Sequence, residues 1–195
     1  MKLVLASGNK KKLLELQQLL APLGWEVLPQ SEFDVPEADE TGLTFVENAI
    51  IKARNACHYT GLPALADDSG IEVDALKGAP GIRSARFAGE HGNDAANNAL
   101  LIQQLKGVPD AERSARYQAL LVFMQHAADP TPIICQGSWE GRIIDNPRGE
   151  NGFGYDPHFY LPELDKTAAE LDAASKNSIS HRGRALAQLL ERLSA

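Results

Sequence analysis

The chain is poor in cysteine and carries no excess of positive charge. Only two of its 195 residues are cysteines, Cys57 and Cys135, and they lie far apart with no CxxC pair. We therefore expect two buried thiols in a reducing compartment rather than a disulfide framework or a cysteine metal site. Lys and Arg number 19 against 26 Asp and Glu, a formal net charge of -7 that argues against a general nucleic-acid or anionic-membrane surface.

Long apolar runs are missing as well. Residues 3–6 are the only apolar stretch before Ser7, which is too short for the hydrophobic region of about 7 to 15 residues in a signal peptide. No later run approaches the roughly 20 residues that span a bilayer. We therefore expect a cytoplasmic protein that binds neither nucleic acid nor membrane. With 44% hydrophobic residues, the composition is typical of a globular chain that buries a sizeable core.

The hydrophobic pattern predicts alternating strands and helices, and hence a single mixed α/β domain. A capping box at Thr44 and Glu47 marks the start of one helix, whose polar face carries Asn48, Lys52 and Asn55. Further predicted elements are strands over 2–6, 64–66, 71–75, 114–125 and 133–144, helices through 13–20 and 95–105, a turn at 67–70, a glycine-rich loop at 149–157, and a last helix through 186–193 that follows Ser180, His181 and Arg182.

The first candidate site is Ser7-x-Asn9-x-x-Lys12, at the point where a strand gives way to a helix. Helix N-termini present unpaired N–H groups and a positive partial charge, so a polyphosphate could bind here with Lys12 as the point charge. The motif is not a P-loop, because GxxxxGK[ST] does not occur. The alternative is a solvated lysine run beside a helix cap.

The second candidate site combines Asp67 and Asp68 with an acidic loop that contains Glu37, Asp39 and Glu40. Magnesium is usually held by one or two carboxylates together with substrate phosphates, so Glu40 and Asp68 could bring the metal to a triphosphate. The alternatives are a solvated charge cluster for the loop and a turn carboxylate for Asp68.

The third candidate site joins the loop from Gly152 to Pro157 with Lys176, His181 and Arg182. Purine recognition needs an aromatic ring that stacks on the base and donors that face its edge. A 6-oxo purine accepts hydrogen bonds at the position where adenine donates them. The alternative is that Phe153 and His181 are ordinary core and surface residues.

Taken together, the segments SxNxxK, ADDSGI, GFGYDPHF and SHRGRA resemble the inosine/xanthosine triphosphate pyrophosphatase family, in particular its bacterial branch. The order and spacing of the four motifs agree from Leu3 to Leu193. The resemblance implies an elongated two-lobed α/β fold of the anticodon-nuclease-like kind around a long mixed sheet. It also implies a homodimer, with residues 1–195 as one catalytic domain and a magnesium-dependent active site in the cleft between the lobes.

The family's functional residues can be assigned by motif. The resemblance implies triphosphate contacts at Ser7, Gly8, Asn9, Lys10, Lys11, Lys12 and Lys52, metal ligands at Glu40 and Asp68, a proton acceptor at Asp68, a substrate contact at Ser69, and a base-and-sugar pocket at Phe153, Gly154, Tyr155, Asp156, Lys176, His181 and Arg182. The expected reaction converts dITP, ITP and XTP to the monophosphate and pyrophosphate, which keeps deaminated purines out of DNA and RNA.

Two other classes of function stay open from the residues alone. A phosphatase could use Asp67 or Asp68 as a nucleophile and form an aspartyl-phosphate, and a regulatory protein could bind the nucleotide without turnover. The products distinguish the three, because the phosphatase would release orthophosphate and the regulator would release nothing.

Overall fold

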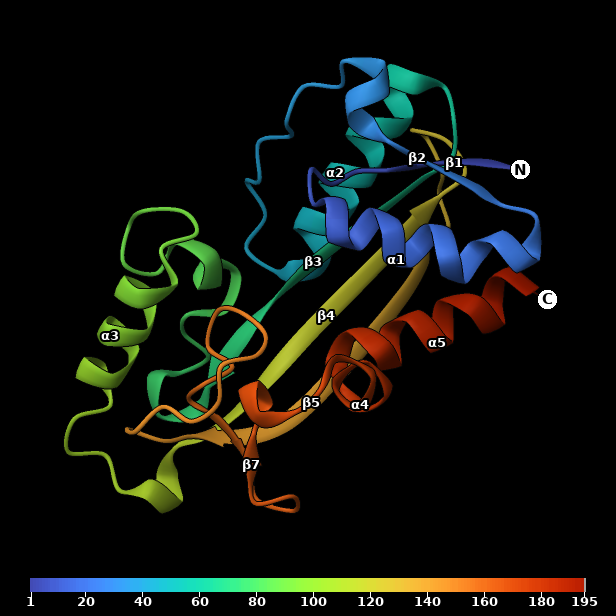
Figure 1. Ribbon diagram of the computed structural model, residues 1–195. Coiled ribbons are helices and arrows are strands. Elements are labelled where there is room, and N and C mark those ends of the chain that lie inside the picture. Colours follow the sequence, from blue (N-terminus) through green and yellow to red (C-terminus); the bar gives the residue numbers. More distant parts are fainter. Residues whose placement is uncertain (195) are drawn as a thin grey trace. The chain divides into compact units, whose positions relative to one another are not determined.

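The computed structural model describes residues 1–194, apart from the side chain of Lys11. No helix among these residues is both long and apolar enough to cross a membrane. The strands are β1 (Lys2–Leu5), β2 (Glu26–Pro29), β3 (Ala64–Val73), β4 (Ser114–Met124), β5 (Ile133–Ile143), β6 (Phe159–Leu161) and β7 (Lys166–Thr167), and the helices are α1 (Lys10–Leu20), α2 (Phe45–Thr60), α3 (Asp94–Gln104), α4 (Ala173–Ile179) and α5 (His181–Ser194) (Figure 1).

The described residues form two compact units, each assembled from separate stretches of the chain. The first unit comprises residues 1–68, 120–136 and those from 185 onward, and the second comprises residues 69–119 and 137–184. The boundaries fall within β3, β4, β5 and α5, so each of these elements contributes residues to both units.

The strands pair in the order β2-β1-β3-β4-β5-β6-β7. Strand β1 is parallel to β2 and β3, while β6 is antiparallel to β5 and β7, which confirms the predicted mixed α/β fold. The pairing of β1 with β3 ends at Leu5 and Leu65, and β3 continues to Val73. Asp67 and Asp68 therefore lie beyond the carboxyl end of β1.

In the first unit, α2 packs on the sheet through a stripe of alanines. Ala49, Ala53 and Ala56 are fully buried in a cluster that also contains Val4 of β1, and their spacing places them on one face of the helix. Their small side chains let the helix axis come close to the strands. Figure 1 shows α1, whose Leu20 is fully buried, on the near side of this part of the sheet and α2 behind it.

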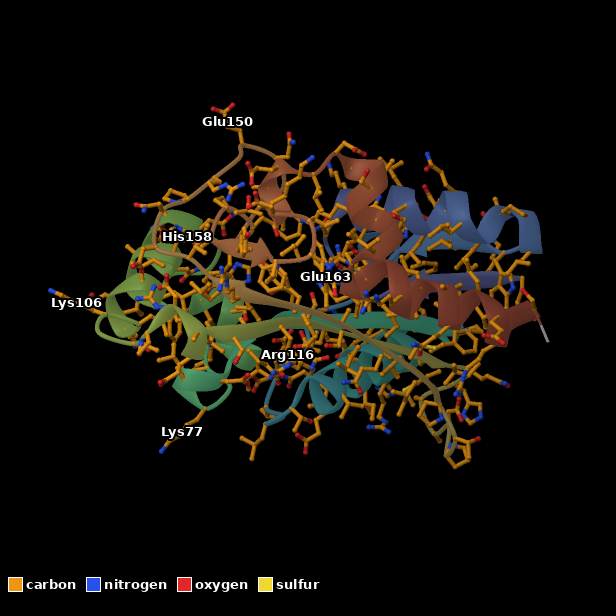
Figure 2. The ribbon with its side chains drawn as sticks, turned by 90° about the horizontal axis from the view of Figure 1, so that it is seen from below. Lys77, Lys106, Arg116, Glu150, His158 and Glu163 are labelled. Carbon is orange, nitrogen blue, oxygen red and sulfur yellow. The ribbon has the colours of Figure 1, made fainter. Side chains whose placement is uncertain are left out.

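In the second unit, alternate residues of the strands point to opposite faces of the sheet. Ile71 and Tyr117 belong to a buried apolar cluster with Trp139 and Phe159. The neighbouring residue on β4, Arg116 (labelled in Figure 2), points to the opposite face of the sheet. We call this the charged face, because the Arg116 guanidinium there donates to the Asp74 carboxylate at 2.8 Å.

Most predicted elements are confirmed, with ends that differ by a few residues. The turn predicted at residues 67–70 is wrong, because β3 runs through them without interruption. The sequence Asp-Asp-Ser-Gly favours a turn, yet the carboxylates of Asp67 and Asp68 each meet a lysine, and the Ile71 amide donates to Ser84 Oγ at 2.9 Å. These tertiary contacts stabilise the extended chain.

The start of the last helix also differs from the prediction. His181 and Arg182 are the first two residues of α5 rather than part of a segment before it. Ser180 accounts for this, because its Oγ accepts from the Gly183 amide at 3.3 Å and so caps the helix. Lys176 lies in α4, which the sequence pattern did not predict.

Candidate functional site

The loop between β1 and α1 is closed by its own polar side chains. Ser7 Oγ accepts from the Asn9 amide at 3.2 Å, and Asn9 Oδ1 accepts from the Lys12 amide at 3.3 Å. Asn9 thus occupies the capping position before α1, which begins at Lys10. No acidic residue lies in the first turn, so the positive end of this helix faces lysines rather than a carboxylate. An anion bound here would relieve that unfavourable arrangement.

Of the neighbouring predicted phosphate contacts, Gly8 and Lys10 are exposed, and the side chain of Lys11 lies outside the described part of the chain. The side chain of Lys12 turns back toward the sheet. Its Nζ binds both carboxylate oxygens of Asp67, at 2.8 and 2.6 Å, and the Asp67 side chain is only 7% exposed. The structure therefore gives Asp67 a definite role as the partner of Lys12, which sequence reasoning did not assign.

The next residue of β3, Asp68, faces α2. Its Oδ1 accepts from Lys52 Nζ at 2.9 Å, and the same ammonium lies 3.2 Å from Glu40 Oε1. Burial opposes the charge on Lys52, but the carboxylates of Asp68, Asp67 and Glu40 together raise the pKa of Lys52 above its ordinary value. The predicted metal ligands Glu40 and Asp68 are therefore brought together around one cation.

Burial also raises the pKa of Asp68 above its ordinary value, and the favourable charge of Lys52 only partly opposes this shift. Its Oδ2 has no hydrogen-bond partner among the residues described, so this oxygen can accept from a water molecule. A carboxylate with a raised pKa and a free oxygen is suited to accept a proton. We refer to Lys12, Asp67, Asp68, Lys52 and Glu40 as the two-lysine cluster.

A polar stripe on α2 holds the acidic loop in place. Asn48 is fully buried, and its Oδ1 accepts from the Gly42 amide at 2.9 Å. One turn later Lys52 binds Glu40, and Asn55 Nδ2 donates to the Pro36 carbonyl at 2.8 Å. The three side chains lie on one helix face because they are spaced by four and three residues. This stripe was visible in the sequence, but its partners were not.

In the second unit, the Asp156 carboxylate gathers three donors. It is 2% exposed and accepts from the ammonium of Lys176, from the Phe153 amide at 2.8 Å and from the Tyr117 hydroxyl at 3.2 Å. Burial, together with the nearby charge of Asp156, raises the pKa of Tyr117 well above its ordinary value, which keeps the phenol a donor. A side chain at Gly152, whose φ is +80°, would collide with Oδ2 of Asp156. We call Asp156 and its three donors, from Lys176, Phe153 and Tyr117, the Asp156 cluster.

The two aromatic residues of the glycine-rich loop have different surroundings. Phe153 is 65% exposed, and Lys176 Nζ lies 5.0 Å from the centre of its ring. Tyr155 is buried, and its hydroxyl donates to the Ser84 carbonyl at 2.7 Å. Phe153 therefore has a ring face available for a ligand, whereas Tyr155 anchors the loop to the protein.

The imidazole of His181 stacks on Tyr117, with ring centres 4.8 Å apart and planes 11° from parallel. Tyr117 therefore links His181 to the Asp156 cluster, a connection that sequence reasoning missed because β4 presented Tyr117 only as a core residue. Arg182 follows His181 in the first turn of α5, and Ser69 follows Asp68 on β3, where it is half-buried.

The residues described contain no group of three or more His, Cys, Asp or Glu side chains arranged to hold a metal ion. The donor set of the two-lysine cluster nevertheless suits a hard cation, because oxygens of Glu40 and Asp68 converge on a single point that Lys52 Nζ now approaches. One or two carboxylates plus substrate phosphates is the usual environment of Mg2+.

Comparison with known proteins gives consistent results along the whole chain. The family model described as the Ham1 family matches residues 3–192. The chain is 59% identical over 194 residues to a dITP/XTP pyrophosphatase of Vibrio parahaemolyticus, covering 100% of this chain and 97% of that one. It is 60% identical over 193 residues to the dITP/XTP pyrophosphatase of Thioalkalivibrio sulfidiphilus, covering 99% and 98%. A solved structure, a HAM1 protein from Coxiella burnetii, superposes with a TM-score of 0.96 at 52% identity and covers 100% of this chain and 98% of that one.

Proposed function

Because the chain belongs to the Ham1 family, we propose that it is a nucleoside triphosphate pyrophosphatase that hydrolyses dITP, ITP and XTP to the monophosphate and pyrophosphate. The full-length relatives named dITP/XTP pyrophosphatase support the same family assignment that the sequence motifs indicated. The observation that carries the proposal is the two-lysine cluster, in which adjacent carboxylates of β3 hold lysines from two helices.

We assign binding of the triphosphate to the two-lysine cluster. The N-terminus of α1, the side chains of Ser7 and Asn9, and the ammonium groups of Lys12 and Lys52 supply donors and positive charge for phosphate oxygens. Asp67 and Asp68 hold the two lysines in place until a polyphosphate competes for them. Hydrolysis of a phosphoanhydride needs positioning and neutralisation of charge more than a covalent intermediate.

Asp68 is assigned as the proton acceptor. Burial raises its pKa, and its Oδ2 can accept a hydrogen bond from the water that attacks the α-phosphorus. Lys12 and Lys52 then stabilise the charge that develops on the transferred phosphoryl group and on the pyrophosphate leaving group.

We further propose that the reaction depends on Mg2+ held by Glu40 and Asp68, whose oxygens already converge on one cation. A divalent ion bound there would neutralise phosphate charge and orient the triphosphate. Lys52 would then be released from Glu40 to bind a phosphate oxygen.

We assign binding of the base and the sugar to the second unit. The exposed ring of Phe153 offers a stacking surface, and Lys176, His181 and Arg182 can donate to the 6-oxo edge of a deaminated purine. Adenine presents a donor at that edge and should be refused, because donors that the bound base covers would then lack acceptors.

A homodimer in the cytoplasm completes the proposal. Family resemblance supports the dimer, together with the arginine-bearing segment 81–87, in which Arg83 is exposed while Phe87 packs against the core of its own unit. Analytical ultracentrifugation at micromolar concentration tests the dimer, and a monomeric mass would contradict it. The cytoplasm is where nucleoside triphosphate substrates are available.

Product identity tests the activity directly. We expect the wild-type protein with dITP and Mg2+ to release one pyrophosphate for each dIMP. Release of orthophosphate would favour a phosphatase that forms an aspartyl-phosphate, and no product at saturating Mg2+ would favour a regulatory nucleotide-binding protein.

A further inference from the structure

The ring of Phe153 is held by few contacts of its own. It is 65% exposed, the ammonium of Lys176 lies over the ring, and the Phe153 amide donates to the Asp156 carboxylate. A side chain that does not pack into a core is positioned mainly by the backbone that carries it. The next residue, Gly154, has a φ of +62°, so the backbone here has a conformation that other residues rarely adopt.

Helix α3 forms hydrogen bonds to both the amide and the carbonyl of Gly154. The Gly154 amide donates to Asp94 Oδ2 at 2.7 Å, and the Gly154 carbonyl accepts from Asn98 Nδ2 at 2.8 Å. Asp94 and Asn98 are four residues apart, so they lie one above the other on the same face of the helix. Asp94 therefore supplies the acceptor for the Gly154 amide, and Asn98 supplies the donor for the Gly154 carbonyl.

The helix that carries this pair is itself well anchored within the second unit. Asn97 is buried, its Oδ1 accepts from the Ala88 amide at 2.8 Å, and its Nδ2 donates to the Ala85 carbonyl at 3.3 Å. Asn93 caps the helix by accepting from the Ala96 amide. The contacts to Gly154 thus come from a helix that is itself anchored by hydrogen bonds.

We propose that Asp94 and Asn98 are positioning residues that set the place and tilt of Phe153 for stacking on the purine base. The proposal rests on the proposed function and deepens it, because it names residues outside the substrate pocket that determine how well the base is held. Neither residue needs to touch the nucleotide. Their effect is transmitted through the peptide groups on either side of Gly154.

The experiment measures two affinities for each variant, one for dIMP and one for inorganic tripolyphosphate. We expect Asn98→Asp, which keeps the shape but replaces the donor by an acceptor, to weaken dIMP binding about tenfold. Gln103→Glu adds the same charge at an exposed position of α3 and serves as the matched control. Tripolyphosphate has no base, so its affinity should be equal in Asn98→Asp and Gln103→Glu.

A conservative pair tests the other contact. Asp94→Ala removes the acceptor for the Gly154 amide and should weaken dIMP binding several-fold, whereas Asp94→Asn retains an acceptor oxygen and should restore most of the affinity. Thermal unfolding of each variant shows that it is folded. If Asn98→Asp does not fold, Asn98→Ala takes its place.

The dependence on Phe153 separates positioning from a general structural effect. In a Phe153→Leu background, where the stacking surface is already lost, Asn98→Asp should cause no further loss of dIMP affinity. The proposal is overturned if Asn98→Asp and Gln103→Glu bind dIMP equally, or if the losses from Asn98→Asp and Phe153→Leu simply add. Failure of the proposed function is a different result, because the wild type would then release no pyrophosphate from dITP.

Discussion

Asp67 and Asp68 are neighbours on β3, yet they bind lysines that come from different helices. Side chains alternate along a strand, so Asp67 meets Lys12 of α1 while Asp68 meets Lys52 of α2. This alternation requires the residues to be extended, which the turn expected from their sequence would not have provided. Two lysines from separate helices can thereby bind adjacent residues in the middle of one strand.

Asp68→Asn should lower turnover by about 10²- to 10⁴-fold while leaving the fold and most of the nucleotide affinity intact. The amide has nearly the same shape, but it is a poor base and a weaker ligand for Mg2+. Pyrophosphate release and unfolding by urea are the measurements. Asp74→Asn, on the charged face of the second unit, is the control and should leave turnover unchanged. Near wild-type turnover in Asp68→Asn would remove Asp68 from the mechanism.

Lys12→Met should raise KM for dITP and lower kcat, because a charge that neutralises the triphosphate is lost. It should also reduce the free energy of unfolding by on the order of 2 kcal/mol, since the Asp67 carboxylate stays buried after losing its lysine. Adding Asp67→Asn should recover stability but not activity. Effects on stability that add instead of compensating would show that the two side chains are not coupled.

Asn48→Ala should weaken the apparent affinity for Mg2+ several-fold and lower stability by about 1–3 kcal/mol. The Gly42 amide would lose its acceptor, and the loop that carries Glu40 would lose one of its attachments to α2. Turnover measured against Mg2+ concentration provides the test. His58→Ala, at an exposed position of the same helix, is the control, and an equal response in the two variants would contradict the role of Asn48.

Arg182→Ala should lower kcat/KM more for ITP and XTP than for GTP and ATP. The rigid donors of a guanidinium favour an acceptor at the purine edge, and that preference is lost with the side chain. The measurement is the specificity constant for all four nucleotides in the wild type and the variant. An equal loss for every nucleotide would mean that Arg182 holds the substrate without selecting it.

Stability should fall in alkali because of Cys57. Burial raises the pKa of its thiol to about 11 from an ordinary 9.0, so the folded protein holds this proton more tightly than the unfolded chain. The stabilisation is complete below pH 9 and is lost as the pH rises toward 11. We expect the free energy of unfolding to drop by on the order of 2 kcal/mol more between pH 8 and 10.5 in the wild type than in Cys57→Ala. Equal pH dependence in the two proteins would contradict this assignment.

The sequence was most informative where a pattern is local. The helix start with Thr44 as its cap and the strand predicted over 114–125 follow from local patterns, and the structure confirms both, with the strand ending at Met124. The motifs also pointed to Lys12, Lys52 and Asp68 before their contacts were known.

The rest depended on tertiary contacts that no local pattern encodes. The turn at 67–70 was predicted from residues that favour turns, because the lysines that stabilise the extended form are 16 and 55 residues away in the chain. Tyr117 and Asn98 were not predicted to contact the glycine-rich loop, for a related reason. Each contacts a loop far along the chain, through a hydroxyl or an amide that the sequence shows only as part of a strand or a helix.

The division of the chain into two units has a consequence for how the protein can change over time. The four boundaries between the units all fall inside a strand or a helix, and neither unit is one continuous piece of sequence. A recombination event that exchanges one contiguous stretch of gene cannot replace either unit alone, and a cut at any boundary would break an element that both share. If the second unit binds the base and the first unit binds the phosphates, as proposed above, new base preferences in such a chain are expected to arise by point substitutions within the second unit.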